Sequence, residues 1–427
     1  KMGVSDVIVS PIKMKEINPS KDLQIFLNNH IKILTAPAIS DLNSDNKEEL
    51  HIGNIESIHI EDLLERSTIN IDTKNVASFL KNKVIMVTGA AGSIGSEIVR
   101  QVLSFHPHAT ILVEQAESPL HDLRMDLNAQ FPEETFISVI GDVRSYEKMS
   151  IVFEEYHPDI VFHAAAYKHV PLMEEFPNEA IQANVLGTKN MADLSVKYGV
   201  QRFVMISTDK AVNPTNVMGA SKRIAEIYVQ SLFRKLYQEN PDCTKFITTR
   251  FGNVLGSNGS VIPFFKKQIA QGGPVTVTHP DITRFFMTIP EACNLVLEAA
   301  TLGQGGEIFA FDMGHPVKIA DLARNMIRLA GFQPDVDIHI EYTGLRPGEK
   351  LYEEVLNQKE TTLPTTNEKI RIARVREVEY EFANKQVEEL IAISHQGNVM
   401  NTVSRMKQIV PEYKSKNSLF EQLDKRK

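Results

Sequence analysis

The feature that most constrains this chain is a regular alternation of short apolar runs with longer amphipathic segments between residues 83 and 250. The apolar runs have the length of strands, and the segments between them carry apolar residues at helical spacing. Strands that are apolar throughout are typical of a parallel sheet covered by helices on both faces. The simplest topology is a doubly wound (Rossmann) sheet of the α/β class. The expected strands are Lys83–Val87, Ala109–Val113, Thr135–Ile140, Ile160–His163, Phe203–Ser207 and Phe246–Arg250, and the expected helices are Ser93–Ser104, Pro119–Asn128, Ser145–Tyr156, Asn178–Tyr198 and Met218–Tyr237.

A glycine-rich loop lies between the first strand and the first helix. It holds Gly89, Gly92 and Gly95 at three-residue spacing. Glycines permit a tight turn and a close approach of the backbone to a pyrophosphate, which a Cβ atom would obstruct. The helix that starts at Ser93 and Ile94 offers free N–H groups and its positive dipole end to phosphates. Strand, glycine loop and helix in this order predict a dinucleotide site rather than an ordinary turn.

Side chains suited to the rest of a dinucleotide follow the next strands. Glu114 stands 19 residues after the last glycine of the loop, where an acid accepts hydrogen bonds from ribose hydroxyls. Its charge would repel a 2′-phosphate, and no Arg or Lys follows at once, so NAD is favoured and NADP is less expected. Asp142 and Val143 follow the third strand, at the expected adenine edge. Ala164–Ala166 and Tyr167 follow the fourth, where small side chains leave room for the cofactor.

Composition excludes several classes of protein. The 427 residues are 42% hydrophobic, enough for more than one core. The net charge of −8 argues against a nucleic-acid partner. Cys243 and Cys293 stand far apart, which predicts no disulfide framework and no metal site and is typical of a reduced, cytoplasmic chain. The sequence contains no apolar run of transmembrane length and no signal peptide.

Four parts are predicted along the chain. They are a linker or accessory segment (1–80), an NAD-binding Rossmann domain (81–255), a smaller lobe that mainly binds substrate (256–360) and a C-terminal extension (361–427). The first part contains a polar run at 41–49 and an amphipathic patch at 58–64, with no recognisable chemistry. The end of the last part, 414–427, is rich in Lys, Asp and Glu and is expected to be solvated.

Seven ordered stretches carry a resemblance to a known family. They are Thr88–Ser96, His163–Glu174, Ser207–Ala211, Met218–Lys222, Arg250–Gly256, Asp281–Met287 and Leu345–Lys350. The chain resembles the extended short-chain dehydrogenases/reductases and, more closely, the UDP-N-acetylglucosamine 4,6-dehydratases of the polysaccharide-biosynthesis branch. The resemblance implies a hydro-lyase of bacterial glycan biosynthesis that holds NAD tightly and recycles it. Residues 1–80 look like the end of the linker that follows membrane helices in the long members, so the full-length protein is expected at the inner membrane, with this catalytic part in the cytoplasm.

The resemblance also implies the reaction and its residues. A hydride leaves C4 of the sugar for NAD, water is eliminated across C5 and C6, and the hydride returns to C6. By family analogy Asp209 protonates the leaving hydroxyl and Lys210 handles the C5 proton. The group that takes the O4 proton stays open with Met218 in place, and Thr208 is a candidate to relay it to a neighbour. Asp209 must then be protonated and Lys210 partly neutral, although the proximity of the two favours the charged pair. The alternative is a plain ion pair in a loop.

One position departs from the superfamily pattern. Where Tyr-x-x-x-Lys is usual, this chain has Met218 and Lys222. A thioether cannot ionise and cannot take a proton from the substrate. The resemblance to long-chain members with Met at this place implies retention at C5 and a xylo-configured 4-keto-6-deoxy product. Lys222 lies one helical turn on and is implied to hold the nicotinamide ribose.

The same stretches imply the contacts to UDP-N-acetylglucosamine. Arg284 and Arg346 are the candidates for the diphosphate, because guanidinium binds phosphate in a bidentate manner. Both could instead form surface salt bridges. Asn253 is expected at the diphosphate or sugar edge, Lys168 at the sugar or its N-acetyl group, and Glu349 at the uridine ribose.

Two other functions stay open from the sequence. A nucleotide-sugar 4-epimerase shares the fold but would be expected to keep the tyrosine and does not need an Asp-Lys pair. A catalytically silent NAD-binding regulator would tolerate the loss of the tyrosine. The helices Asn178–Tyr198 and Met218–Tyr237 resemble those that form a four-helix dimer interface in the superfamily, so at least a homodimer is expected.

Overall fold

The computed structural model describes residues 6–9, 25–26, 31–35, 56–57, 72–354 and 362–424. The chain divides into two compact units, of which one comprises 1–69, 255–284 and 316–344 and the other 70–254, 285–315 and 345–427. The patterns at 41–49 and 58–64 lie outside the described residues, and the division into four parts stays a prediction. Among the described helices, none is long and apolar enough to cross a membrane.

The larger unit is built on a nine-stranded sheet with the order β17-β18-β14-β9-β8-β7-β4-β5-β6. All strands from β6 to β14 are parallel, and β18 and β17 add an antiparallel edge. The predicted doubly wound sheet is confirmed, with its switch point between β4 and β7. The strands are β4 (Val84–Thr88), β5 (Ala109–Glu114), β6 (Phe136–Ile140), β7 (Ile160–His163), β8 (Arg202–Ile206), β9 (Lys245–Arg250), β14 (Ile308–Phe311), β17 (Thr362–Pro364) and β18 (Ile370–Ala373).

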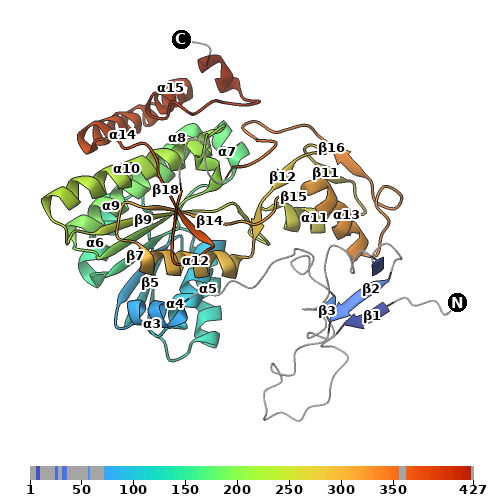
Figure 1. Ribbon diagram of the computed structural model, residues 1–427, viewed down its shortest axis with the longest axis horizontal. Helices are drawn as coiled ribbons and strands as arrows, with labels where there is room; N and C mark the ends of the chain where they lie inside the picture. Colours follow the sequence, from blue (N-terminus) through green and yellow to red (C-terminus); the bar gives the residue numbers. More distant parts are fainter. Residues whose placement is uncertain are drawn as a thin grey trace. The chain divides into compact units, whose positions relative to one another are not determined.

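Helices cover both faces of this sheet (Figure 1). One face carries α3 (Thr73–Leu80), α4 (Ser93–Leu103), α5 (Glu117–Gln130) and α12 (Ile289–Leu302), and the other carries α6 (Tyr146–Tyr156), α9 (Gly187–Lys197) and α10 (Val217–Glu239). The strands are apolar on both sides because both sides are buried: Met86, Ile111, Val161 and Phe203 are almost fully enclosed. The elements begin and end close to the predicted residues.

The predicted helix Asn178–Tyr198 is interrupted. It consists of α8 (Pro177–Ala180), a π-helical turn η5 (Ile181–Leu186) and α9, and a short helix α7 (Val170–Glu175) precedes it. A π turn adds a residue to the helical turn and is frequently found at functional sites. Here it contains Asn184, whose side chain reaches the loop after β7.

The C-terminal extension forms a helical hairpin of α14 (Tyr380–Ser394) and α15 (Val399–Ile409), followed by η7 (Leu419–Leu423). In Figure 1 the hairpin lies outside α10. The prediction that 414–427 is solvated holds for exposed side chains such as Lys414 and Glu421. It is wrong for Phe420, which is buried, and the backbone N–H of Lys416 donates to Thr215. Burial of the apolar Phe420 side chain is favourable enough to hold this segment against the protein, although the residues around it are charged.

The hairpin also changes the expectation about the dimer interface. Every residue of α10 from Val217 to Phe233 is buried within one chain. Tyr380 of α14 packs its ring against Tyr228, and Glu412, just beyond α15, pairs with Arg223. The helix face predicted to meet a partner is therefore already covered, and a dimer would have to use another surface.

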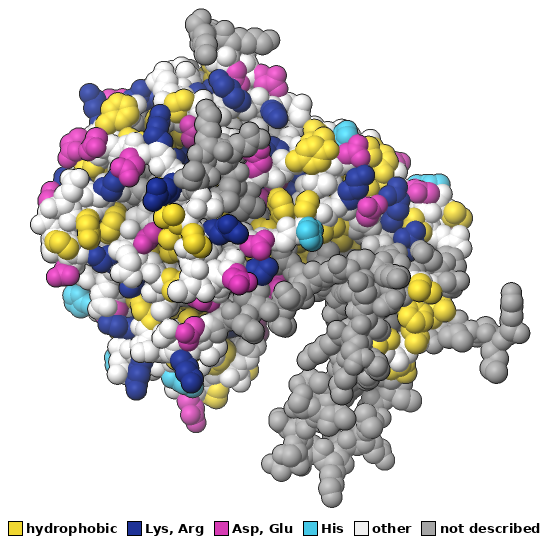
Figure 2. Space-filling view, viewed as in Figure 1, with side chains coloured by type: hydrophobic (Ala, Val, Ile, Leu, Met, Phe, Trp, Pro, Cys, Tyr) yellow, Lys and Arg dark blue, Asp and Glu magenta, His cyan; other side chains and the backbone are white. Residues whose placement is uncertain are grey.

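The described part of the smaller unit contains three small sheets. β1 (Asp6–Val9) and β2 (Lys32–Thr35) are parallel, and β3 (Glu56–Ser57) joins β2 antiparallel. The others pair β11 (Val275–Val277) with β16 (Ile340–Tyr342) and β12 (Thr283–Arg284) with β15 (Val317–Lys318), beside α11 (Val261–Ala270) and α13 (Ile319–Leu329). In the larger unit β10 (Asn253–Val254) pairs with β13 (Phe286–Met287). On the face drawn in Figure 2, basic and acidic side chains of the described residues are interspersed.

Candidate functional site

The glycine loop joins β4 to α4 at the switch point of the sheet, and its three glycines serve different purposes. Gly89 has a φ of +64°, and a Cβ there would lie 2.7 Å from the backbone nitrogen of Ala165. A Cβ on Gly95 would lie 2.0 Å from the carbonyl oxygen of Gly89. Backbone packing therefore requires both. A Cβ on Gly92 would meet only that same oxygen, at 3.2 Å, so Gly92 is the position that leaves room for a ligand.

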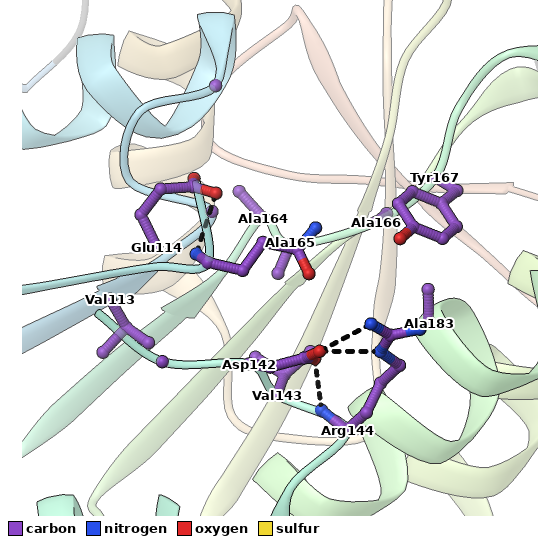
Figure 3. Close-up of a pocket in the computed structure, with 14 residues that line it drawn as sticks. Val113, Glu114, Asp142, Val143, Arg144, Ala164, Ala165, Ala166, Tyr167 and Ala183 are labelled. Atoms are coloured by element: carbon purple, nitrogen blue, oxygen red, sulfur yellow. Dashed lines mark hydrogen bonds and ion pairs between the residues drawn. The ribbon is translucent and has the colours of Figure 1, made fainter. Parts of the chain in front are cut away.

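A pocket opens beside this loop (Figure 3). It brings together most of the predicted cofactor residues, namely Gly89, Gly92, Glu114, Asp142, Val143, Ala164, Ala165, Ala166 and Tyr167. Ser93, Ile94 and Gly95 continue from the loop into α4 without lining it. The sequence reasoning missed Val113, Gln115, Gly141, Arg144 and Ala183, which also line the pocket. The carboxyl ends of β5, β6 and β7 thus form one ligand-sized space, as the topology requires.

Glu114 is fixed at the end of β5. Its carboxylate accepts hydrogen bonds from the backbone N–H groups of Ala91 at 3.3 Å, Gln115 at 2.9 Å and Ala116 at 3.1 Å. The bond from Ala91 ties the strand end to the glycine loop. An acidic group held in this way between the loop and the pocket suits a ribose diol.

Asp142, at the end of β6, is paired with Arg144. The Arg144 backbone N–H, Nε and Nη2 lie 2.9, 2.8 and 2.7 Å from the Asp142 carboxylate, and Arg144 also reaches Glu179 at 3.2 Å. Burial alone would raise the pKa of Asp142, but hydrogen bonds and the charge of Arg144 outweigh it and lower that pKa. Figure 3 shows this pair at the pocket. Arg144 was detectable, because it directly follows the Gly141-Asp142-Val143 stretch.

The end of β7 is anchored by buried polar side chains. His163 lies between Thr88 at 2.8 Å and Thr188 at 3.1 Å, and burial lowers the pKa of His163 to about 3. Hydrogen bonds thus hold the neutral imidazole of His163 in place directly before Ala164–Ala166. Asn184 accepts from the backbone N–H of Tyr167 at 2.8 Å and donates to its carbonyl at 3.0 Å. The same amide donates to Ser221 on α10 at 2.9 Å, so one side chain holds the pocket loop to the helix.

Lys222 and Glu226 are both buried on α10, one turn apart. Burial lowers the pKa of Lys222 to about 8, against the opposing charge of Glu226. The Lys222 ammonium has no hydrogen-bond or ion-pair partner in the described part of the chain. Glu226 binds Arg250 at 2.6 and 2.8 Å, Arg223 at 3.0 Å and Ser207 at 2.7 Å. Burial opposes ionisation of Glu226, but Arg250 leads the groups that lower its pKa to about 2.

Asp209 and Lys210 follow β8 in a short 3₁₀ turn, η6 (Asp209–Ala211). The side chain of Asp209 is 1% exposed and that of Lys210 is 17% exposed. Oδ1 of Asp209 accepts from Lys210 Nζ and from Thr208 Oγ1, each at 3.0 Å. Oδ2 is buried and has no hydrogen-bond partner among the described residues. A buried carboxylate oxygen without a partner costs free energy, which is typical of functional sites.

Met218 occupies the first turn of α10. It is buried, and its carbonyl accepts from the Ser221 hydroxyl at 2.7 Å. Asn216 caps the helix through Gly219 N–H at 2.7 Å. A Cβ on Gly219 would lie 2.1 Å from the Lys210 carbonyl oxygen, so the start of α10 packs directly on η6. Met218 and the Asp209–Lys210 pair are therefore neighbours.

The segment from Leu345 to Glu354 closes over this region. Lys350 Nζ donates to the Val212 carbonyl at 2.8 Å, and the Gly348 carbonyl accepts from Thr215 at 2.9 Å. Glu353 Oε1 lies 3.8 Å from Lys210 Nζ, and its side chain is 3% exposed. Sequence reasoning missed Lys350 and Glu353, although both lie in or just after the matching stretch that ends at Lys350.

The predicted substrate residues lie in different places. Asn253, at the start of β10, accepts from Lys210 Nζ at 3.0 Å and so joins the Asp209 cluster. Arg346 is exposed and pairs with Glu349 at 3.2 Å. Partial burial lowers the pKa of Lys168, which reaches the surface. Arg284 belongs to the smaller unit, where it is buried and donates to the carbonyl of Thr283 at 2.7 Å.

Comparison with known families places the chain among carbohydrate-related proteins. The family model described as "Polysaccharide biosynthesis protein" matches residues 85–375. Among curated relatives, the capsular polysaccharide biosynthesis protein CapD of Staphylococcus aureus is 50% identical over 86% of this chain and 59% of its own length. The probable polysaccharide biosynthesis protein EpsC of Bacillus subtilis is 48% identical over 79% of this chain and 55% of its own length. The chain thus spans little more than half of these relatives.

Further matches include one curated relative and two solved structures. A UDP-glucose 4-epimerase of Rickettsia canadensis is 37% identical over 65% of this chain and 79% of its own length. The X-ray structure of Pen from Bacillus thuringiensis matches with a TM-score of 0.63 and 33% identity, over 71% of this chain and 92% of that one. The dTDP-glucose 4,6-dehydratase DesIV of Streptomyces venezuelae, with NAD bound, has a TM-score of 0.54 at 19% identity, over 74% and 97% of the two chains, and shows the shared fold alone.

Proposed function

Because the chain belongs to the polysaccharide biosynthesis protein family, we propose that it is a nucleotide-sugar 4,6-dehydratase that acts on UDP-N-acetylglucosamine with retention at C5. The observation that carries the proposal is the Asp209–Lys210 pair after β8, in which one buried oxygen of Asp209 has no partner in the described part of the chain. Removal of water across C5 and C6 needs an acid at the leaving hydroxyl and a base at C5, side by side.

The pocket beside the glycine loop fits a nicotinamide dinucleotide, and we propose NAD. Gly92 leaves room for the pyrophosphate, and Glu114 suits the ribose diol. The ammonium of Lys222, which has no partner among the described residues, suits the second ribose. Arg144 could attract a 2′-phosphate, but its guanidinium is held by Asp142 and Glu179. When bound, the nicotinamide supplies the hydride acceptor for C4 and the donor for C6. A cofactor regenerated in each cycle is expected to copurify with the protein.

Within this proposal the protons follow the hydrogen bonds around Asp209. The Thr208 hydroxyl donates to Asp209 Oδ1 at 3.0 Å. The O4 proton passes to the Thr208 oxygen while the Thr208 proton passes to Asp209, which takes the place of the tyrosine replaced by Met218. Asp209 then gives this proton to the leaving C6 hydroxyl, and water departs. Lys210 takes the C5 proton and later returns it to the same face, so both side chains end as they began.

The substrate contacts are proposed on chemical grounds. Asn253 and Lys168 would bind the sugar or its N-acetyl group, and Arg346 with Glu349 would bind the uridine diphosphate. Exposed Arg346 can exchange its contact with Glu349 for a phosphate, because that pair gains little in water. Arg284 is proposed for the diphosphate as well.

One experiment tests the function directly. The protein is incubated with UDP-N-acetylglucosamine in deuterated water, and the product is followed by NMR. A 4-keto-6-deoxy sugar of xylo configuration is expected. Inversion at C5 would overturn only the assignment of retention. Absence of a dehydrated product from protein that carries NAD would overturn the proposal. NAD binding without nucleotide-sugar binding in calorimetry would then indicate a silent regulator.

The alternative is a nucleotide-sugar 4-epimerase, and a specific observation favours it: the Rickettsia canadensis relative carries that name. Epimerisation needs oxidation and reduction at C4 but no acid at C6 and no base at C5. Asp209 would then serve only as the acceptor of the O4 proton, and Lys210 would have no proton to take from C5. In the same NMR experiment an epimerase would give the galacto-configured sugar with its C6 hydroxyl intact.

We also propose that the catalytic part works in the cytoplasm and forms at least a homodimer. Cys243 and Cys293 are both free thiols, as expected under reducing conditions. A dimer must use a surface other than the covered face of α10. A monomeric mass in light scattering at micromolar concentration would overturn the dimer.

A further inference from the structure

A second buried carboxylate, Glu353, lies beside the Asp209–Lys210 pair. Its Oε1 is 3.8 Å from Lys210 Nζ. Lys210 Nζ also donates to Asp209 Oδ1 and to Asn253 Oδ1, each at 3.0 Å. This nitrogen therefore has at least two hydrogen-bond acceptors and one further carboxylate at ion-pair distance, and an ammonium group has N–H donors for all of them. The arrangement fits Lys210 best when Lys210 is protonated.

Glu353 comes from a different part of the chain than the pair it faces. It follows the stretch that Lys350 ties to the loop after η6 by its bond to the Val212 carbonyl at 2.8 Å. The adjacent Glu354 points elsewhere and accepts from Asn213 at 2.9 Å. Of these two neighbouring carboxylates, that of Glu353 lies beside Lys210 and that of Glu354 lies beside Asn213.

From this geometry we infer that Glu353 is a positioning residue that stabilises the ammonium forming on Lys210 when Lys210 takes the C5 proton. The inference rests on the proposed dehydratase function and adds a residue to it. As the C5–H bond breaks, the new N–H bond turns a neutral amine into a cation beside the Glu353 carboxylate, while Asp209 carries the proton that it gives to the C6 hydroxyl. Stabilisation that grows with the developing charge lowers the barrier, as the acid beside a catalytic histidine does.

A second lysine, Lys350, offsets part of the negative charge that Asp209 and Glu353 bring to the cluster. Lys350 is largely buried, and burial lowers its pKa while Glu353, Glu354 and Asp209 raise it. Two carboxylates, Asp209 and Glu353, therefore face two lysines, Lys210 and Lys350. The C4 oxidation does not change the charge of Lys210, so Glu353 is expected to matter for elimination and not for that first step.

The test is Glu353→Gln, which keeps the shape and removes the charge. Wild type and variant are mixed with UDP-N-acetylglucosamine in single turnover. Nicotinamide absorbance reports C4 oxidation, and deuterium exchange at C5 together with product NMR reports elimination. We expect elimination to slow on the order of tenfold or more, with C4 oxidation unchanged. Glu353→Asp should restore part of the rate, and Glu354→Gln is the matched control with the same change of charge and no expected effect on elimination.

A second readout does not depend on turnover. The pH dependence of Lys210 acetylation, measured by competitive labelling and mass spectrometry, should shift so that more neutral amine is present in Glu353→Gln at a given pH. Asp209, Glu353 and Lys350 are the charged groups that set this titration. Equal loss of both steps, or unchanged elimination and labelling, would overturn the role of Glu353 while wild type still made product. If wild type formed no dehydrated product, the proposed function and this inference would both fail.

Discussion

Asp209 is the residue on which the proposed reaction depends most directly. Its Oδ1 is fully engaged by Thr208 and Lys210, whereas its buried Oδ2 lies against Gly252, where an added Cβ would come within 2.9 Å. Asp209→Asn keeps the volume and removes the acid. We expect the dehydration rate to fall by about 100-fold or more, which is the range of general acid catalysis. Calorimetry should show NAD and UDP affinities close to wild type, and a comparable loss of NAD binding would contradict the catalytic role.

The buried ammonium of Lys222 is expected to lower the free energy of unfolding at neutral pH. A lysine in the unfolded chain has a pKa of about 10.4, whereas burial lowers the pKa of Lys222 to about 8 in the folded chain. Below pH 8 both states carry the proton and the folded state bears the full cost of the buried charge. Between the two pKa values the unfolded chain binds more protons, so the stability of wild type rises with pH. Lys222→Met is expected to raise the free energy of unfolding near pH 7 by up to about 3 kcal/mol.

Urea unfolding at about pH 7 and about pH 10 measures the difference in free energy of unfolding between Lys222→Met and wild type. This difference should shrink toward zero at the higher pH. NAD affinity should fall in the same variant, because the ribose loses its cation. Lys235→Met is the control, since Lys235 lies at the surface of the same helix and pairs with Glu381 at 3.7 Å. A Lys222→Met protein less stable than wild type at neutral pH would show that the ammonium has a stabilising partner.

At the scale of elements, the π turn η5 couples the cofactor pocket to α10. Asn184 makes its three bonds to Tyr167 and Ser221 only because the wider turn turns its side chain toward the loop after β7. Asn184→Leu keeps the volume and breaks all three. We expect a loss of stability of about 2–4 kcal/mol, at about 1 kcal/mol or more per bond, and weaker NAD binding because Ala164–Tyr167 is no longer held.

Asn398→Ala provides the comparison for this variant. Asn398 caps α15 through Asn401 N–H at 3.1 Å, so its loss costs about 1 kcal/mol far from the pocket. Thermal unfolding measures stability and calorimetry measures NAD affinity in both proteins. If Asn398→Ala weakened NAD as much as Asn184→Leu, the effect would reflect general stability and the coupling by η5 would be wrong.

The elements with regular patterns were the ones that the sequence predicted well. The strand Ile160–His163 was predicted to the residue, because a fully buried parallel strand shows its limits as an apolar run. The helix Asn178–Tyr198 was placed correctly but taken as one α-helix, since a π turn leaves no mark in apolar spacing. Residues beyond 251 were predicted only as irregular, because two-residue strands such as β10 and β13 are too short to show a period.

The site was predictable where a motif stands next to a strand end. Glu114, Asp142 and Asp209 all follow strands, so the rule for parallel sheets places them at one edge. Arg144 directly follows the Gly141-Asp142-Val143 stretch, so its place at the pocket could have been found from the sequence. Glu353 was missed for a different reason. Its role depends on its approach to Lys210 in space, and a single sequence does not record such a pair. The NAD, substrate and stereochemical assignments stay predictions.

At the scale of the whole molecule, the C-terminal hairpin takes the place that a partner subunit was expected to occupy. Gln182 in η5 donates to Ser394 at the end of α14 at 2.5 Å, and Thr402 on α15 donates to Asn178 at 2.7 Å. Beyond α15, Ser418 donates to Glu174 at 2.5 Å, and Glu174 accepts from Val217 N–H at 2.7 Å. The extension therefore supports both α10 and the turn that precedes Met218, and it belongs to the larger unit.

This arrangement predicts that the larger unit needs the hairpin for its stability. Leu390 on α14 is fully buried in the same hydrophobic cluster as Tyr228 and Val229 of α10. Leu390→Asp would place an unpaired carboxylate there, which we expect to cost more than about 3 kcal/mol of unfolding free energy. Leu419→Asp, at a position 60% exposed, should change stability by about 0.5 kcal/mol or less. Urea unfolding measures both variants. Light scattering should also detect self-association of Leu390→Asp, because loosening the hairpin exposes the apolar face of α10. A Leu390→Asp protein as stable as wild type would mean that α10 does not need the hairpin as a cover.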